Sequence, residues 1–566
     1  MNWAEIKRLN KTLKENLKGP EKEIAVISNI TINSLKEILE LVLRKEKINV
    51  TIKLGDFDSL MRDSIKFSTS DAVIIFWEIA NLIPGISENF SSLSKEKQNE
   101  IVDQKKLEIK EVLENLEKTP LVLFNKFSSH KYSNDPVCYD KASFISNLLN
   151  KELEIVKKNN TFLIDLNKIF HTAENAINER QYALTSELYT NLFYIKYSDS
   201  IKHFFMSLYG RTKKVLIMDC DNSLWGGILG EDGENEIAIG RNSVKGKIYL
   251  KVQKIIKKFV SEGTLLALCS KNNSKDVDEV LRKNKNMIIK DEDIIIKKVN
   301  WKDKASNIQE ISKELNLSTD SFIFVDDSKF EIGLINKEFP EIKTILVPEN
   351  LEDYPSLMQN LEKDFFRLSS TSEDKIRTQL YSEEDERKKT KKSFENLKDY
   401  LRSLNLKLKI HKGKEVSVPR AAQMSQRTNQ FNLTTKRYSE EDIKKFIQDD
   451  SAGIFTFELS DKFGDYGITG MSICKIEGSE AEIDTFLLSC RVIGRDIEYV
   501  FLEKIIEDLI KKGIKKVKGF YFETLKNHQV KNFFSEMGFE EDSNKESFIL
   551  HTNQFRSRNI NYVKVI

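Results

Sequence analysis

Five short apolar runs recur between residues 215 and 347, and polar clusters follow several of them directly. These runs are VLIM (215–218), LLALC (265–269), IIIK (294–297), FIFV (322–325) and TILV (344–347). The segments between them carry apolar residues at helical spacing. Strands that alternate with helices form a parallel sheet covered on both faces, and such sheets bind ligands beside the carboxyl ends of their strands. We therefore expect a binding crevice where the polar clusters lie.

Two further blocks flank this one. Residues 22–205 alternate apolar runs with amphipathic segments in the same way, which predicts a second parallel sheet. Residues 393–566 mix amphipathic helices with strand-like runs, which favours an α+β domain with a mainly antiparallel sheet. The charge run at 369–392 is typical of a solvated helix or linker. A chain of 566 residues has room for about three or four domains.

The composition excludes several classes of protein. Lys and Arg number 90 against 88 Asp and Glu, so no overall field favours nucleic acid or an anionic membrane. No apolar stretch approaches the roughly 20 residues that span a bilayer, and the first residues lack the apolar region of a signal peptide. Five cysteines without C-x-x-C spacing indicate reduced thiols. We expect a cytoplasmic protein with no nucleic-acid partner and no membrane insertion.

Asp219 and Asp221 follow the first apolar run of the central block. Two carboxylates at this spacing suit phosphoryl transfer, in which one attacks phosphorus and the other handles the proton of the leaving group or of water. A divalent cation would have to offset the repulsion between carboxylate and phosphate. By itself, however, D-x-D-x-S is equally typical of a turn or a helix cap.

Three further elements strengthen the phosphoryl-transfer interpretation. Ser270 follows the second run and can hold a phosphoryl oxygen, and Lys304 opens a helix and supplies a fixed positive charge. Asp326 and Asp327 end the fourth run and offer the hard oxygen ligands that Mg²⁺ prefers. No His or Cys stands at ligand spacing, which favours Mg²⁺ over Zn²⁺. The expected metal-side carboxylates are those of Asp219, Asp221, Asp326 and Asp327.

This ordered set resembles the four motifs of the haloacid-dehalogenase (HAD) superfamily of phosphotransferases. Longer strings resemble its class IIIC, the FkbH-like proteins. In the central block they are DCDNSLWGGILGEDG (219–233), CSKNN (269–273), NWKDKASNI (300–308) and FVDDSKFE (324–331). In the third block they are RAAQMSQRTNQFNLTTKRYS (420–439), DKFGDYGITG (461–470), LLSCRVIGRDIE (487–498) and KNHQVKNFFSEMGF (526–539).

The resemblance implies an α/β fold class with three domains. A Rossmann-like HAD core at 211–350 would follow an SGNH- or flavodoxin-like α/β domain at 1–205. A GNAT-like α+β domain at 393–566 would come after the charged linker at 369–392. The first domain is expected to be non-catalytic: Ser28-Asn29 lacks the usual glycine–aspartate lead, and no D-x-x-H occurs between His171 and His203.

FkbH-like proteins are known for loading a glycolytic acyl phosphate onto an acyl-carrier-protein thiol and removing phosphate. The resemblance therefore implies an acyl carrier protein and a phosphorylated small-molecule donor as partners, with Asp219 as nucleophile and Asp221 as acid/base. Ser270 and Lys304 would clamp the phosphate. Two alternatives stay open: a plain phosphatase of surface-glycan or metabolite biosynthesis, and a non-catalytic scaffold that docks a carrier protein.

Two cysteines are candidates for an enzyme thioester. Cys269 adjoins Ser270, and Lys271 beside it could lower the pKa of the thiol, although strand alternation could equally turn Cys269 into the core. Cys490 precedes a stretch that resembles the pyrophosphate loop of GNAT acyltransferases. Direct attack by the carrier thiol, with no enzyme thioester, is equally consistent with the sequence.

That loop implies a site for coenzyme A or a phosphopantetheine arm. The residues expected to hold it are Arg491, Gly494 and Arg495. Asp496 and Phe534 depart from the GNAT pattern, because Asp496 brings negative charge and Phe534 replaces a usual tyrosine acid. N-acetyltransferase activity is therefore not expected.

The intervals between the HAD motifs are short. Core helices and strands take up most of the chain between Asp219 and Ser270 and between Ser270 and Lys304. No room remains there for a folded cap domain, so the crevice should be open to a bulky, protein-tethered substrate unless a flanking block acts as its lid.

Overall fold

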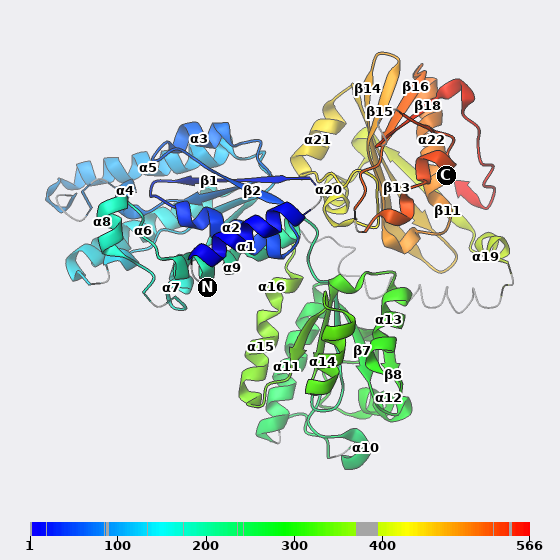
Figure 1. Cartoon of the computed structure of the whole chain (residues 1–566), viewed down its shortest axis with the longest axis horizontal. Helices are drawn as coiled ribbons and strands as arrows, with labels where there is room; N and C mark the ends of the chain where they lie inside the picture. Colours follow the sequence, from blue (N-terminus) through cyan, green and yellow to red (C-terminus); the bar gives the residue numbers. More distant parts are fainter. Residues whose placement is uncertain are drawn as a thin grey trace. The chain divides into compact units, whose positions relative to one another are not determined.

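The computed structural model describes residues 3–17, 20–83, 85–86, 90–132, 134–173, 175–234, 236–241, 243–368, 394, 396–524, 526–542 and 546–566. The chain divides into two compact units, Met1–Tyr209 and Gly210–Ile566 (Figure 1). The first unit contains one sheet and the second contains two. The predicted linker at 369–392 lies outside the described residues.

The first unit is built on a parallel sheet with the strand order β2-β1-β3-β4-β5. Its central strands are continuous apolar runs, as expected when helices cover both faces. Helices α1, α2 and α9 pack together on one face and α3, α5 and α6 on the other (Figure 1). The strands are β1 (Lys22–Ser28), β2 (Val50–Leu54), β3 (Ala72–Phe76), β4 (Val122–Asn125) and β5 (Thr161–Ile164). The helices are α1 (Trp3–Asn16), α2 (Asn33–Lys45), α3 (Leu60–Lys66), α5 (Lys95–Asn115), α6 (Pro136–Val156) and α9 (Asn191–Leu208).

Polar side chains at the carboxyl ends of β1 and β3 bind to one another. The Ser28 hydroxyl donates to the Phe76 carbonyl at 3.0 Å. The Asn29 amide donates to the Glu78 carbonyl at 2.9 Å, and its side-chain oxygen accepts from the Glu78 N–H at 2.7 Å. Both Ser28 and Asn29 are buried. They therefore cross-link two strand ends, in keeping with the expectation that no serine nucleophile acts here.

The second unit begins with another parallel sheet, of order β10-β9-β6-β7-β8. Every residue of β6, β7 and β9 is buried. The strands are β6 (Val215–Met218), β7 (Leu265–Ser270), β8 (Ile294–Val299), β9 (Phe322–Asp326) and β10 (Lys343–Leu346). The helices are α10 (Leu229–Asp232), α11 (Val244–Ser261), α12 (Ser274–Lys283), α13 (Lys304–Leu315), α14 (Lys329–Glu338) and α15 (Tyr354–Asn360). Apart from β7, the described residues between β6 and β8 form helices and loops and pair into no further sheet.

The second sheet of this unit is mainly antiparallel, as predicted, and follows the order β17-β18-β16-β15-β14-β13-β11-β19. Its central pair, β15 and β16, is parallel and is connected through α22. The strands are β11 (Leu406–Lys412), β12 (Phe431–Asn432), β13 (Ala452–Ser460), β14 (Asp465–Glu477), β15 (Glu480–Leu488), β16 (Lys516–Phe520), β17 (Glu540–Glu541), β18 (Ser547–His551) and β19 (Val563–Val565). The helices are α19 (Leu397–Ser403), α20 (Val418–Arg427), α21 (Glu440–Gln448) and α22 (Ile497–Lys511).

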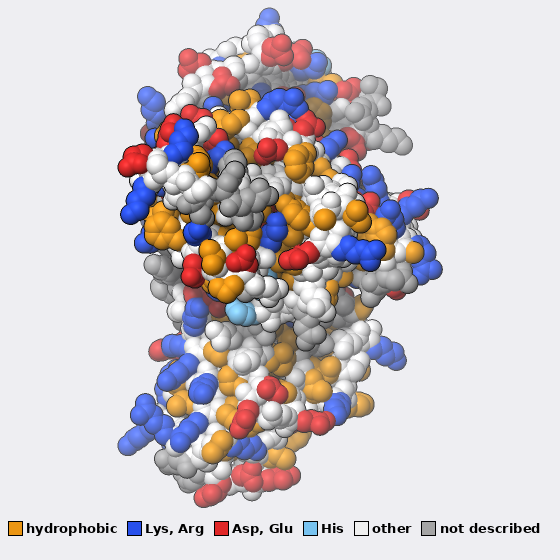
Figure 2. Space-filling model, turned by 90° about the vertical axis from the view of Figure 1, so that its left-hand side faces the viewer, with side chains coloured by type: hydrophobic (Ala, Val, Ile, Leu, Met, Phe, Trp, Pro, Cys, Tyr) orange, Lys and Arg blue, Asp and Glu red, His pale blue; other side chains and the backbone are white. Residues whose placement is uncertain are grey.

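Charges of both signs occur on the face shown in Figure 2, with basic, acidic and apolar side chains interspersed over most of it. This mixture matches the net charge of +2. Among the described residues, no helix combines the length and the apolar character needed to cross a bilayer.

Candidate metal centre and phosphoryl-transfer site

A buried ammonium group joins two buried carboxylates at the carboxyl ends of β6 and β9. The Lys304 Nζ lies 2.6 Å from Asp219 Oδ1 and 2.6 Å from Asp326 Oδ2. Lys304 is the first residue of α13, and the Asp303 side chain caps this helix by accepting from the Ser306 N–H. The cap fixes where the helix begins, and therefore the direction in which Lys304 enters the site.

The electrostatics of this group favour a cation. Burial raises the pKa of Asp219 and of Asp326, and the Lys304 ammonium opposes both shifts. Burial acts to lower the pKa of Lys304, but the two carboxylates outweigh it and raise that pKa. One ammonium cannot fully compensate two buried carboxylates, so the site retains excess negative charge.

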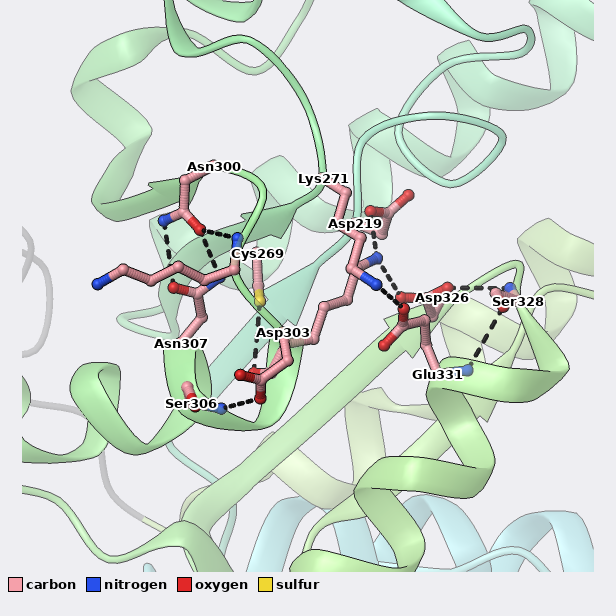
Figure 3. Close-up of polar contacts among 12 residues, drawn as sticks. Asp219, Cys269, Lys271, Asn300, Asp303, Ser306, Asn307, Asp326, Ser328 and Glu331 are labelled. Atoms are coloured by element: carbon pink, nitrogen blue, oxygen red, sulfur yellow. Dashed lines mark hydrogen bonds and ion pairs between the residues drawn. The ribbon is translucent and has the colours of Figure 1, made fainter.

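Asp327 completes a candidate metal centre. Asp219, Asp326 and Asp327 each offer one oxygen, and these oxygens lie within 4.8 Å of one another. Three carboxylates and one ammonium sum to two negative charges, which one divalent cation would balance. The all-oxygen set suits Mg²⁺. The residues present therefore fit Mg²⁺, the metal expected from the sequence. Figure 3 shows Asp219 beside Asp326 and Ser328 at the end of β9.

Asp221 is held apart from this cluster. Its Oδ1 accepts from the Trp225 indole at 3.0 Å and from the Leu229 N–H at 3.1 Å. Its Oδ2 accepts from the Asn272 amide at 2.8 Å. Because Asp221 is not among the clustered carboxylates, its predicted role as a metal ligand is not supported. Three donors instead orient its carboxylate, as an acid/base group requires.

Two helices brace the loop that carries Asp219 and Asp221. The Tyr354 hydroxyl of α15 donates to the Ser223 carbonyl at 3.0 Å. From α11, the Tyr249 hydroxyl donates to the Asn222 carbonyl at 3.0 Å and the Gln253 amide donates to the Leu224 carbonyl at 2.9 Å. These contacts satisfy the loop carbonyls and fix the backbone of the site. The spacing of these bracing residues in the chain gives no sign that they converge, and the CSKNN string does not indicate that Asn272 holds Asp221.

Strand alternation sends Ser270 and Cys269 in opposite directions. The Ser270 hydroxyl acts to lower the pKa of the Asp219 carboxylate, against the larger effect of burial, as expected of a residue that faces the site. Cys269 is fully buried in the core between the sheet and α13, and its Sγ lies 3.9 Å from the Lys304 carbonyl (Figure 3). Burial raises the pKa of the Cys269 thiol to about 12. This placement contradicts the predicted role of Cys269 as a nucleophile, because a buried thiol at this pKa is neither accessible nor ionised.

Lys271 does not activate that thiol. Its ammonium lies 2.6 Å from Glu331 Oε1 on α14, so it points away from Cys269 (Figure 3). The pair links the segment after β7 to the helix after β9. The hypothesis that Lys271 lowers the pKa of Cys269 is therefore wrong.

The loop expected to bind pyrophosphate sends its two arginines in different directions. Arg491 lines a cavity, to which Cys490 and Ser489 also belong. Arg495 is buried: its guanidinium lies 5.2 Å from the centre of the Tyr466 ring and donates to the Arg491 carbonyl at 2.7 Å. Gly494 has a left-handed backbone, and the space where a side chain would project is open. The three residues do not converge as a single clamp.

The two departures from the GNAT pattern have structural explanations. The Asp496 carboxylate accepts a hydrogen bond from the Tyr562 hydroxyl near the end of the chain. Phe534 is buried, and its ring fills the space beside Gly519 of β16, where a Cβ would lie 2.4 Å from it. Phe534 is thus a core residue.

A short strand of the chain itself occupies the edge of β15 just before this loop. Phe431 and Asn432 of β12 pair with Leu488 and Leu487. The Asn527 amide holds this strand by donating to the Asn432 carbonyl at 2.9 Å. A phosphopantetheine arm therefore cannot add to this part of the edge while β12 is paired there.

Comparison with known proteins establishes the fold. No family model and no curated protein matches the chain. The N-terminal part of the protein BF1531 from Bacteroides fragilis, which contains a phosphatase domain and is complexed with Mg, is similar over 65% of this chain and 100% of its own. The identity is 23% and the TM-score 0.54.

Acetyltransferases are also similar to part of the chain. The ribosomal-protein-S18-alanine N-acetyltransferase from Escherichia coli is 16% identical and covers 25% of this chain and 90% of its own, with a TM-score of 0.20. A putative GNAT-family acetyltransferase from Desulfovibrio desulfuricans is 7% identical and covers 26% and 99%, with a TM-score of 0.22. TM-scores this low do not establish the fold of that part of the chain. The chain is a multi-domain α/β protein, and its similarity to the phosphatase-containing structure confirms that fold class.

Proposed function

We propose that the chain is a Mg²⁺-dependent phosphotransferase of the HAD type that releases phosphate from an acyl phosphate and delivers the acyl group to a carrier-protein thiol. The observation that carries the phosphoryl-transfer part is the group of Asp219, Lys304, Asp326 and Asp327, with Asp221 held beside it. The proposed domains are those expected from the sequence, at 1–205, 211–350 and 393–566, and the proposed location is the cytoplasm.

In the phosphatase half-reactions, which act on a phosphate ester, the Asp219 carboxylate attacks phosphorus and the bond from phosphorus to the leaving oxygen breaks. Asp221 donates a proton to that oxygen where the leaving group needs one. Asp221 then takes a proton from water, whose oxygen attacks the aspartyl phosphate and frees phosphate and Asp219. Ser270 and Lys304 hold the phosphoryl oxygens. Mg²⁺ bound by the clustered carboxylates would offset the charge of the phosphate. On an acyl phosphate this cleavage would leave the acyl group as an unactivated carboxylate, so acyl transfer follows a separate route through the C–O bond.

The open crevice supports a bulky substrate. Three large apolar side chains are exposed on the segments that carry the site: Ile228 (41% exposed), Trp301 (76%) and Phe330 (72%). Trp301 stands three residues before Lys304, and Phe330 adjoins Glu331. Large apolar side chains exposed on segments that carry a site support contact with another macromolecule. A carrier protein with a phosphopantetheine arm is the proposed partner.

Burial excludes Cys269 from acyl transfer. Of the two candidate thiols this leaves Cys490, which lines a cavity that none of the metal-centre carboxylates lines. We therefore favour direct attack by the carrier thiolate on the acyl carbon. The new S–C bond replaces the C–O bond, and phosphate departs with the bridging oxygen. The thiol proton is lost to solvent.

A plain phosphatase is the second candidate, favoured by the orientation of Asp221, and it breaks a different bond. An acyl phosphate labelled with ¹⁸O at the bridging position tells the two apart. Label in the released phosphate, together with an acylated carrier, supports transfer. Label in the free carboxylic acid supports hydrolysis at phosphorus.

Phosphate release from a small phosphomonoester tests the enzyme class itself. We expect Asp219→Asn to abolish release and the exposed Asp276→Asn, on α12, to leave it unchanged. A chelator should stop the reaction and added Mg²⁺ should restore it. Equal release by the wild type and Asp219→Asn, or no release by either, would leave the carrier-docking scaffold as the better interpretation.

A further inference from the structure

The second unit contains a cavity that is lined by none of the carboxylates of the metal centre. Its volume is about 120 Å³, which is several times what one water needs and below the roughly 300–1,000 Å³ typical of drug-sized ligands. Its size suits a small ion or the head of a larger ligand.

The walls of this cavity are strongly basic. Among the described residues that line it, Asp320 is the one acidic residue. Seven of these described lining residues are basic, namely Arg211, Lys214, Arg367, Arg420, Arg427, Arg491 and Lys526. Lys526 Nζ lies 2.6 Å from Asp320 Oδ2, and the charge of Arg211 also acts on this carboxylate. Basic residues outnumber acidic ones by six in the described lining, and a concave surface of this composition attracts anions.

The positive charges repel one another where they are buried. Burial lowers the pKa of Lys526, Asp320 opposes this, and Arg211 and Arg437 add to the lowering. Burial, together with the charge of Arg211, lowers the pKa of Arg437 to about 10. An anion bound among these groups would relieve the repulsion.

The surrounding backbone is fixed. Arg437 donates to the Thr428 carbonyl at 2.9 Å and also to Asn429, whose amide donates to the Gly210 carbonyl at 3.1 Å. Gly210 has a φ of +66°, and a Cβ there would lie 2.5 Å from the Gln426 carbonyl. Only glycine lets the chain pass this close to α20 and present the following Arg211 to the cavity.

Three of the strings that carried the family resemblance meet in this cavity. Arg420 and Arg427 come from 420–439, Arg491 from 487–498, and Lys526 from 526–539. The metal centre uses none of these strings. Phosphoryl transfer at Asp219 therefore does not explain why these three strings meet at one place.

We propose that this cavity is a second anion site, which binds the phosphate or pyrophosphate group of a ligand. The ligand is either a free phosphate ion or the phosphate end of a larger molecule such as a phosphopantetheine arm. The inference goes beyond the proposed function, because the site is independent of Mg²⁺ and of Asp219.

Calorimetric titration of the full chain with pyrophosphate, in chelator and at low salt, tests the proposal. Binding should weaken about tenfold or more in Arg427→Gln and in Arg491→Gln, because each removes a charge-assisted hydrogen bond. Arg402→Gln, an exposed arginine paired with Asp399, is the matched control and should bind like the wild type. Binding should also fall as salt rises.

Hydrogen exchange locates the site. Pyrophosphate should protect peptides covering 420–432 and 488–492 in the wild type. An absence of binding, an unchanged affinity in both arginine variants, or loss of binding in Lys304→Met alone would overturn the proposal. Orthophosphate and 4′-phosphopantetheine are titrated separately. Tighter binding of phosphopantetheine identifies a tethered arm and equal affinity identifies the free ion, and either result supports an anion site.

Discussion

The Asp219 carboxylate is buried, and this lowers the stability of the protein when the carboxylate is ionised and no metal is bound. Because burial raises its pKa, the metal-free fold is penalised for ionising it, and this penalty grows as the pH rises above the unfolded value of about 4. Asp219→Asn should therefore raise the melting temperature of the metal-free protein at pH 8 and have little effect at pH 4. Mg²⁺ should stabilise the wild type and not the variant. Asp327→Asn, at an exposed member of the cluster, is the control and should not raise the melting temperature without metal. A lower melting temperature for Asp219→Asn in chelator at pH 8 would contradict this account.

Glu78 shows the same effect in the first unit. Burial raises its pKa to about 7, although the Tyr189 hydroxyl and Lys131 oppose the shift. The unfolded chain therefore loses this proton first, and stability falls as the pH rises from about 4.5 to 7. Glu78→Gln should remove this loss, with a gain on the order of 2 kcal/mol at pH 8 and none at pH 4. Hydrogen exchange of peptides covering 72–82 measures this gain in stability, and Glu100→Gln, at an exposed residue, is the control. Equal pH dependence in the wild type and Glu78→Gln would refute it.

At the scale of elements, two neighbouring residues between β7 and α12 have different roles: one positions a side chain of the site and the other stabilises a helix. Asn272 holds Asp221, whereas its neighbour Asn273 caps α12 by accepting from the Lys275 N–H. Asn272→Leu should lower kcat for phosphate release about tenfold to a hundredfold, with little change in KM and an altered pH profile, because Asp221 loses a donor. Asn273→Ala should instead cost about 1 kcal/mol of stability and leave kcat unchanged. If both variants behave alike, Asn272 has only a structural role.

The exposed apolar side chains on the segments that carry the site lead to a second prediction at this scale. Trp301→Ala with Phe330→Ala removes apolar area that faces solvent, so stability should hardly change. Release of phosphate from a small phosphomonoester should stay within about twofold, whereas acylation of a carrier protein should lose about tenfold or more in kcat/KM. Leu107→Ala, at an exposed leucine of the first unit, is the control. Equal losses on both substrates would place these residues in the catalytic centre rather than in a docking surface.

The sequence predicts the two parallel sheets and the position of the crevice because both follow from local patterns. Buried strands are continuous apolar runs, and Asp219, Ser270, Lys304 and Asp326 stand at or just after strand ends. The sequence predicts less well those features that depend on where a side chain points. Strand alternation decides that Cys269 enters the core, and only the folded loop shows that Asp221 accepts three hydrogen bonds. The basic cavity draws on segments separated by more than 300 positions, so no local pattern announces it.

At the scale of the whole molecule, the site belongs to one unit. Every residue of the metal centre and its bracing contacts lies between Asp219 and Tyr354, within the unit Gly210–Ile566. The hydrophobic clusters around this sheet contain residues of the second unit alone, and the core of the sheet formed by β1–β5 contains residues of the first. A chain that begins at Gly210 should therefore fold and keep Mg²⁺-dependent phosphate release within about twofold, as measured with a small phosphomonoester. The same chain carrying Asp219→Asn is the control and should be inactive. A folded but inactive fragment would show that the first unit contributes to catalysis, whereas an unfolded one would show that the two cores depend on each other.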